Sequence, residues 1–149
     1  MTDTPGPGRI RILIADDQRV VRDGLAMLLG LIDGVEIVGT ACDGAEAVRL
    51  AQAHRPDLVL MDLRMPGTDG IAATADLRRR LPATRVLVLT TYADQDAIVP
   101  ALRAGARGYL TKDASAGQIK AAIHAVHAGR TWPGRTRRRQ RLRRRVRDG

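Results

Sequence analysis

The sequence predicts an α/β protein in which helices cover both faces of a parallel β-sheet. Short apolar runs of strand character alternate five times with segments whose apolar residues recur at helical spacing, and this alternation is typical of repeated βα units. The apolar runs are nearly continuous, as expected for parallel strands that are buried on both sides. With 149 residues, 44% of them hydrophobic, the chain is long enough to bury one core of ordinary size.

The predicted strands are short and rich in Val, Ile and Leu. They cover residues 10–15, 35–40, 58–61, 86–90 and 108–110. The chain contains two Tyr, one Trp and no Phe. We therefore expect aliphatic side chains to build most of the core.

The predicted helices lie at residues 21–32, 44–53, 71–81, 97–104 and 115–126. The last one has the clearest start, because Ser115 and Gln118 form the S-x-x-Q pattern of a capping box. The fourth contains Pro100, which would remove a hydrogen bond if it lay beyond the first turn of a helix. We therefore expect the fourth helix to begin near Ile98 or to be kinked, and in either case to be short and weakly ordered.

Polar side chains follow the predicted strands at their carboxyl ends. Asp16 and Asp17 follow the first strand, Asp62 ends the third, Thr90 ends the fourth and Lys112 follows the fifth. In an open α/β sheet the carboxyl ends of the strands share one edge, and ligands bind there. We therefore expect these five side chains to gather at one site.

This set of residue types indicates magnesium and phosphoryl chemistry. Three carboxylates held close together repel one another, and a divalent cation relieves that repulsion. Mg²⁺ prefers oxygen ligands, and with Lys112 it would balance the three negative charges. A carboxylate can attack phosphorus to form an acyl phosphate, and phosphoryl transfer depends mainly on positioning and charge neutralisation.

Four segments of the chain resemble the receiver domain of two-component response regulators. They are IADD at 14–17, MDLRMPGTDG at 61–70, LTTYAD at 89–94 and GARGYLTKDA at 105–114. The resemblance covers about residues 9–130, and the last segment together with AGRTW at 128–132 is most similar to the NarL/FixJ (LuxR-type) subgroup. The resemblance implies a flavodoxin-like (βα)5 fold with the strand order 2-1-3-4-5, which is the known order for receivers.

The resemblance also implies a role for each residue around the metal. Asp62 corresponds to the aspartate that accepts the phosphoryl group. Asp17 corresponds to the acid that binds Mg²⁺ directly, and Asp16 to its partner, which often acts through water. Arg64 lies at the position whose main-chain carbonyl reaches the metal, and its side chain is expected to face the mouth of the site.

Three further residues correspond to the parts that respond to phosphorylation. Thr90 corresponds to the hydroxyl that follows the phosphoryl group, and Lys112 to the lysine that pairs with that group. Tyr109 corresponds to the aromatic residue that turns inward on activation. The implied function is a phosphorylation-dependent response regulator of a phosphorelay, with a sensor histidine kinase as partner, a homodimer as a further expected assembly, and transcription regulation as the role of the parent family.

An enzyme is the main alternative to a signalling switch. A Mg²⁺-dependent phosphatase of the haloacid-dehalogenase type also uses an aspartate nucleophile after a parallel strand, but it needs a second acid two positions further on. Here that position is Arg64, which cannot act as the general acid. We therefore expect no turnover enzyme, and turnover of simple phosphate esters would favour the alternative.

Charge is distributed unevenly along the chain. Ten of the 25 basic residues and one of the 16 acidic residues lie at positions 130–149, so fifteen of each remain before this segment. We expect a flexible leader at residues 1–8 and a receiver domain at 9–130. Residues 131–149 would form an Arg-rich tail that is disordered or remains from a truncated linker or output region.

The tail leaves three interpretations open. A NarL/FixJ-type regulator would continue into a helix-turn-helix DNA-binding domain of about 60 residues, whereas 17 residues follow Trp132 and only Leu142 and Val146 among them are apolar. We favour a truncated or frame-shifted end that lacks the helix-turn-helix. The alternatives are a basic arm that binds nucleic-acid phosphates without reading bases, which would make the protein a nucleic-acid-binding module, and an inert solvated extension.

The sequence predicts a soluble, cytoplasmic protein. Its one cysteine, Cys42, cannot form an internal disulfide, which fits a reducing compartment. The leader MTDTPGPG has no apolar segment of the kind found in signal peptides. No window approaches the roughly 18 apolar residues that a membrane span needs, so we expect no membrane partner.

Overall fold

The computed structural model describes residues 9–132, in which five parallel strands form one sheet of order β2-β1-β3-β4-β5. The strands are β1 (Ile10–Ala15), β2 (Val35–Ala41), β3 (Leu58–Asp62), β4 (Arg85–Thr90) and β5 (Gly108–Thr111). The predicted α/β class, the parallel sheet and the strand order are confirmed. The leader at 1–8 and positions 133–149 of the predicted tail lie outside the described residues.

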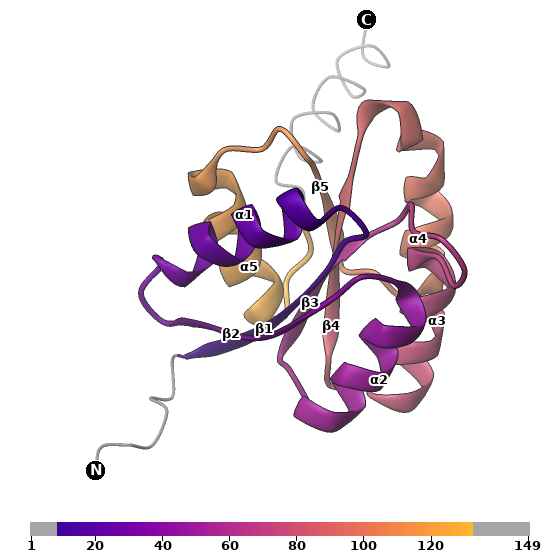
Figure 1. The fold of residues 1–149 in the computed structure, drawn as a ribbon, viewed down its shortest axis with the longest axis horizontal. Coiled ribbons are helices and arrows are strands. Elements are labelled where there is room, and N and C mark those ends of the chain that lie inside the picture. The colour runs from indigo at the N-terminus through magenta and orange to yellow at the C-terminus, as the bar shows by residue number, and fades with distance from the viewer. Residues whose placement is uncertain (1–8, 133–149) are drawn as a thin grey trace, which may run out of the picture.

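Helices cover both faces of the sheet (Figure 1). They are α1 (Arg19–Gly30), α2 (Gly44–His54), α3 (Gly70–Arg80), the 3₁₀ helix η1 (Tyr92–Ala97), α4 (Ile98–Ala104) and α5 (Ala116–His127). Helices α1 and α5 lie on one face, and α2, α3 and α4 lie on the other (Figure 1). Among the residues from 9 to 132, no helix is long and apolar enough to cross a membrane.

Each strand contributes side chains to two apolar layers, because successive side chains of a strand point to opposite faces. In β3, Val59 and Met61 pack on the α2–α3–α4 face, whereas Leu58 and Leu60 pack on the α1–α5 face. All four are fully buried. The sheet is therefore covered on both sides, as the continuous apolar runs predict.

Close backbone approaches shape the loop that follows β3. A Cβ atom at Gly70 would lie 2.3 Å from the carbonyl oxygen of Asp62, so only glycine lets α3 begin this close to the end of the strand. A Cβ atom at Gly44 would lie 2.4 Å from the carbonyl oxygen of Thr68, and the Gly44 amide donates to that oxygen at 3.0 Å. These contacts hold the loop after Asp62 between α2 and α3.

The fourth helix is short, as Pro100 predicts. Helix α4 has seven residues and begins at Ile98, so Pro100 occupies its third position. Amide groups in the first turn have no partner within the helix, and proline removes no hydrogen bond there. The chain enters α4 through η1, in which Asp94 departs from helical geometry with φ −108° and ψ 20°.

The chain returns to the sheet after α5. Trp132 forms an isolated parallel bridge with Gly108 on the outer edge of β5. This pairing lies beyond position 130, where the sequence places the end of the domain.

Candidate functional site

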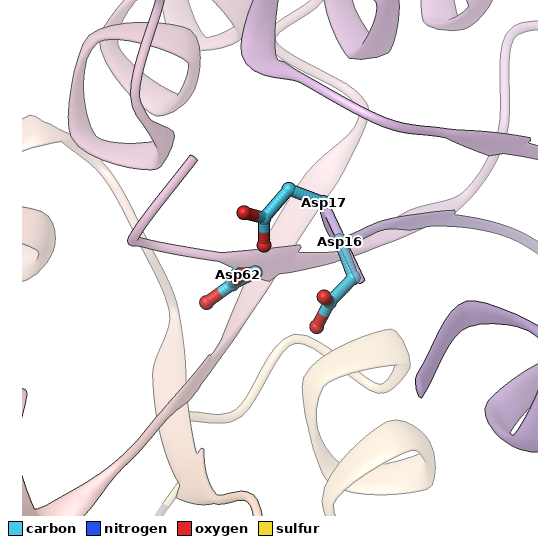
Figure 2. Close-up of side chains that lie close together, drawn as sticks. All are labelled: Asp16, Asp17 and Asp62. Carbon is cyan, nitrogen blue, oxygen red and sulfur yellow. The ribbon is translucent and has the colours of Figure 1, made fainter. Parts of the chain in front are cut away.

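Three carboxylates meet at the carboxyl edge of the two central strands. Asp16 and Asp17 directly follow β1, Asp62 ends β3, and these strands pair directly with each other. One oxygen from each carboxylate lies within 4.8 Å of the other two (Figure 2). Asp16 and Asp62 are buried, with 1% and 3% of their surface exposed, whereas Asp17 is open to solvent.

Lys112 brings a positive charge to this group from the loop after β5. Its Nζ lies 3.1 Å from Oδ2 of Asp16 and 3.4 Å from Oδ1 of Asp62. The backbone of the loop is fixed by the Lys112 amide, which donates to the carbonyl oxygen of Thr90 at 2.9 Å. Burial alone would lower the pKa of the Lys112 amine, but Asp62 and Asp16 outweigh it and hold that pKa above its usual value.

The surroundings of Asp62 disfavour the negatively charged form of its carboxyl group. The pKa of Asp62 is raised from 3.8 to about 6, first by burial and then by the neighbouring Asp16 carboxylate, while Lys112 and the Arg64 amide lower it. The Arg64 amide donates to Oδ1 of Asp62 at 3.3 Å. Asp62 is therefore a buried carboxylate whose negative charge is only partly compensated by the residues around it.

The donor set fits a divalent cation. Oδ2 of Asp16 and Oδ2 of Asp62 are buried and accept no hydrogen bond, although Lys112 lies at ion-pair distance from the first. Buried anionic oxygens without donors are costly, and oxygen ligands are those that Mg²⁺ prefers. The other oxygen of Asp16 accepts the Gln18 amide at 2.8 Å, which leaves Asp16 less free to coordinate than Asp17.

The Arg64 side chain pairs with an acid that the sequence analysis did not assign. Its Nε donates to Oδ1 of Asp94 at 2.7 Å, and Oδ2 of Asp94 accepts the Thr91 hydroxyl at 2.9 Å. The hydrogen bond from Arg64 keeps the pKa of the Asp94 carboxyl below its usual value. This ion pair joins the loop after β3 to the loop after β4. Asp94 lies in the LTTYAD segment, but one acid in a loop carries no specific signal.

Thr90 ends the strand next to Asp62, whereas Tyr109 lies on β5, one strand further out. Asp62 pairs with Leu89 across β3 and β4, so Thr90 is one residue beyond it. The Thr90 hydroxyl is buried and donates to the carbonyl oxygen of Thr91 at 3.3 Å. Tyr109 is half-buried and packs against the apolar layer on the α2–α3–α4 face.

Two cavities of the described residues differ in how they relate to the carboxylates. A cavity of about 510 Å³ between α3 and α4 is lined at the amino ends of the strands by Arg78, Val86 and Arg107, among others, and contains none of the predicted site residues. A smaller hollow of about 230 Å³ is lined by Thr91, Thr111, Lys112 and Asp113. Of these two spaces, the second adjoins the carboxylate group through Lys112.

The doubly covered parallel sheet, with an acidic trio and a lysine at its carboxyl edge, defines the receiver class of signalling domains. The profile of the family described as "Response regulator receiver domain" matches residues 12–124. The chain therefore belongs to the response regulator receiver family of two-component systems. Receiver domains bind Mg²⁺ at an acidic pocket, and this chain has a cluster of three carboxylates, Asp16, Asp17 and Asp62, whose oxygens could hold a metal ion.

Transcription regulators are among the most similar relatives. The transcriptional regulatory protein LnrK of Bacillus subtilis (strain 168) is 47% identical over 120 residues, which cover 80% of this chain and 54% of LnrK. The oxygen regulatory protein NreC of Staphylococcus haemolyticus (strain JCSC1435) is 41% identical over 124 residues, covering 83% of this chain and 57% of NreC. The chain thus spans little more than half the length of these curated relatives.

A solved structure agrees in both fold and subgroup. The two-component response regulator of the LuxR family from Aurantimonas sp. SI85-9A1 superimposes with a TM-score of 0.82 at 36% identity. The match covers 93% of this chain and 99% of that chain. The similarity to the NarL/LuxR group is confirmed.

Proposed function

We propose that the protein is a phosphorylation-controlled signalling switch that accepts a phosphoryl group on Asp62 from a sensor histidine kinase. The observation that supports this most directly is the convergence of Asp16, Asp17 and Asp62 with Lys112 at one edge of the sheet. Three carboxylates alone would only repel one another. With a cation and a lysine, they form a site whose charge suits a phosphoryl group.

Each residue of the site has its own role in the phosphoryl transfer. A carboxylate oxygen of Asp62 attacks the phosphorus, a P–O bond forms, and the P–N bond to the kinase histidine breaks, leaving its electron pair on that histidine. Lys112 is already 3.4 Å from Oδ1 of Asp62 and pairs with the phosphoryl oxygens as they arrive. Asp16, Asp17, Asp62 and the main-chain carbonyl of Arg64 would hold Mg²⁺, which supplies positive charge next to the transferred group.

The response is a local charge change that biases a two-state element. Thr90 and Tyr109 shift inward once Asp62 is phosphorylated, and the surface of α4, β5 and α5 rearranges. Helix α4 suits this role because it is short and has no side-chain cap at its start. The acceptor is not expected to turn over substrates repeatedly, although the acyl phosphate can hydrolyse.

An exposed apolar stripe beside the site supports a protein partner. Val20, Met27 and Leu31 lie on one face of α1 or at its end and are 85%, 72% and 79% exposed. Helix α1 begins two residues after Asp17, so a partner docked on this stripe would reach the acceptor. We propose the histidine kinase as that partner and the cytoplasm as the compartment. A homodimer and DNA binding are proposed only for the full-length form that the relatives represent.

Mass spectrometry of the intact protein tests the acceptor. With Mg²⁺ and a small phosphodonor, we expect an acid-labile adduct of about 80 Da, and Asp62→Asn should abolish it. Asp69→Asn is the matched control, because Asp69 lies in the same loop and caps α3 by accepting the Ala72 amide at 2.9 Å, a cap that asparagine preserves. An adduct that persists in Asp62→Asn would overturn the assignment.

The phosphatase alternative has no support at the position that it needs. The side chain two residues after Asp62 is Arg64, which is paired with Asp94 and cannot donate a proton to a leaving group. Multiple turnovers of p-nitrophenyl phosphate that depend on Asp62 would revive it. Binding of nucleic acid by the basic segment concerns positions outside the described residues.

A further inference from the structure

The chain that leaves α5 returns to the sheet and pairs with β5. It reverses at Gly129, which has a φ of 88°, and the Arg130 amide donates to the carbonyl oxygen of Ala125 at 2.9 Å. The Trp132 amide then donates to the carbonyl oxygen of Arg107 at 3.1 Å, and the carbonyl oxygen of Trp132 accepts the Tyr109 amide at 3.2 Å. Gly108 thus lies between the two backbone hydrogen bonds that join Trp132 to β5.

Gly108 is shaped for this contact. A Cβ atom at this position would lie 2.1 Å from the carbonyl oxygen of Trp132 and 2.9 Å from its side chain. Gly108 does not have a positive φ, so its backbone conformation would admit other residues. The glycine is needed because the backbone of Trp132 comes so close. The Trp132 side chain also packs against the apolar layer on the α1–α5 face.

The pairing reaches the strand that carries the proposed switch. Strand β5 has four residues, and its inner edge is bonded to β4, where Val88 pairs with Tyr109 and Thr90 pairs with Thr111. On the outer edge, one of the two bonds to Trp132 starts from the Tyr109 amide itself. A displacement of Tyr109 therefore acts on β4 and on Trp132 at once.

We propose that the Trp132–β5 pairing is a regulated clasp, which couples Tyr109 to the segment that follows α5 and opens when Asp62 is phosphorylated. This inference rests on the proposed function. The clasp is one isolated bridge of two hydrogen bonds, and a single such bond contributes only about 1 kcal/mol. A displacement of the β5 backbone at Tyr109 breaks one of them directly, and the segment after α5 then loses its fixed direction.

The wild-type chain carries its own reporters of the clasp. Trp132 is its one tryptophan, so the emission spectrum reports on this residue alone. The amides of Tyr109 and Trp132 are the two donors, so their hydrogen exchange reports each bond separately. On phosphorylation with Mg²⁺ and a small phosphodonor, we expect both amides to exchange at least about fivefold faster and the emission to shift to longer wavelength. Asp62→Asn should show neither change.

A substitution opens the clasp without phosphorylation. In Gly108→Ala the new Cβ atom displaces the carbonyl oxygen of Trp132, so we expect red-shifted emission and fast exchange of the Trp132 amide in the unmodified protein. Gly117→Ala is the matched control, since a Cβ atom there meets nothing closer than Oγ of Ser115 at 3.9 Å. Should Gly108→Ala fail to fold, the wild-type comparison before and after phosphorylation decides alone.

The outcomes separate the clasp from the proposed function. An adduct on Asp62 with unchanged exchange at Trp132 overturns the clasp as a regulated element and leaves the acceptor intact. If Gly108→Ala folds and keeps the tryptophan emission and the amide exchange of the wild type, the pairing does not hold Trp132 in place. Absence of any adduct overturns the acceptor, and with it the coupling.

Discussion

Helices α4 and α5 flank the same short strand, and they are built in opposite ways. Helix α5 has twelve residues, a complete capping box from Ser115 and Gln118, and a buried stripe that includes Ile119 and Ile123. Helix α4 has seven residues, no side-chain cap and only Ala101 buried. The stable helix therefore supports one side of β5, and the weak helix lies on the other.

This difference shows where the protein can change shape. Local opening occurs most readily where few apolar contacts and few caps hold a segment, and α4 with η1 meets that description. The same segment begins two residues after Thr90, and the pairing of Asp94 with Arg64 ties it to the loop after Asp62. We therefore expect a change at Asp62 to displace α4 more readily than α5.

Truncating one apolar side chain in each helix should give the largest difference in stability between α4 and α5. Ile123 is fully buried whereas Leu102 is 40% exposed. We expect Ile123→Ala to lower the free energy of unfolding by about 3 kcal/mol and Leu102→Ala to lower it by less than about 1 kcal/mol. Urea denaturation of both variants measures the difference. Equal losses would show that α4 is packed as firmly as α5.

The charge of Asp62, at the end of the central strand β3, should make stability depend on pH. Its pKa is raised from 3.8 to about 6, so between these pH values the folded protein keeps a proton that the unfolded chain releases. The free energy of unfolding therefore falls as the pH rises through this window. Without Mg²⁺, we expect Asp62→Asn to be more stable than the wild type by about 2 kcal/mol at pH 7.5.

Urea denaturation at two pH values checks the sign. At pH 5 the wild type is mostly protonated at Asp62, so the advantage of Asp62→Asn should shrink. A variant that is less stable than the wild type at pH 7.5 would contradict the buried, partly compensated charge.

Hydrogen exchange should show the difference in local stability between α4 and α5 in the wild-type protein. We expect amides of η1 and α4 to exchange at least about tenfold faster than those in the middle of α5, which corresponds to about 1.4 kcal/mol in opening free energy. Mass spectrometry of peptides covering 92–104 and 116–127 gives the two rates. Exchange of α4 as slow as that of α5 would contradict its weak order.

The smallest effect is expected at the proline. Pro100 is the third residue of α4, where no hydrogen bond within the helix is lost. We expect Pro100→Ala to change the free energy of unfolding by less than about 0.5 kcal/mol. A gain of several kcal/mol, again from urea denaturation, would mean that the proline strains the helix.

The fold could be predicted because its signals are local. Apolar runs, helical spacing and the capping box at Ser115 place the predicted elements within one or two residues of the observed bounds. Strands β2, β3 and β5 each end one residue later than predicted, and β4 begins one residue earlier. Pro100 also fixes the start of α4 through a local rule. The strand order came from resemblance to receivers, since alternation alone allows more than one order.

The site could be predicted in part, for a geometric reason. The carboxyl ends of parallel strands share an edge, so Asp16, Asp17 and Asp62 could be placed together from the strand assignments alone. The pairing of Arg64 with Asp94 could not, because it depends on how two loops pack across the edge. The contact between Gly108 and Trp132 was equally invisible, since no pattern in AGRTW indicates a return to the sheet.

The return of Trp132 to the edge of β5 has a practical consequence for anyone who dissects this molecule. A fragment cut at the end of α5 would leave the amide of Tyr109 and the carbonyl of Arg107 without their partners, on a strand margin open to other chains. Exposed edge strands with unpaired backbone groups promote self-association. Grafts and excised fragments should therefore be joined after position 132 and not at the last turn of the helix.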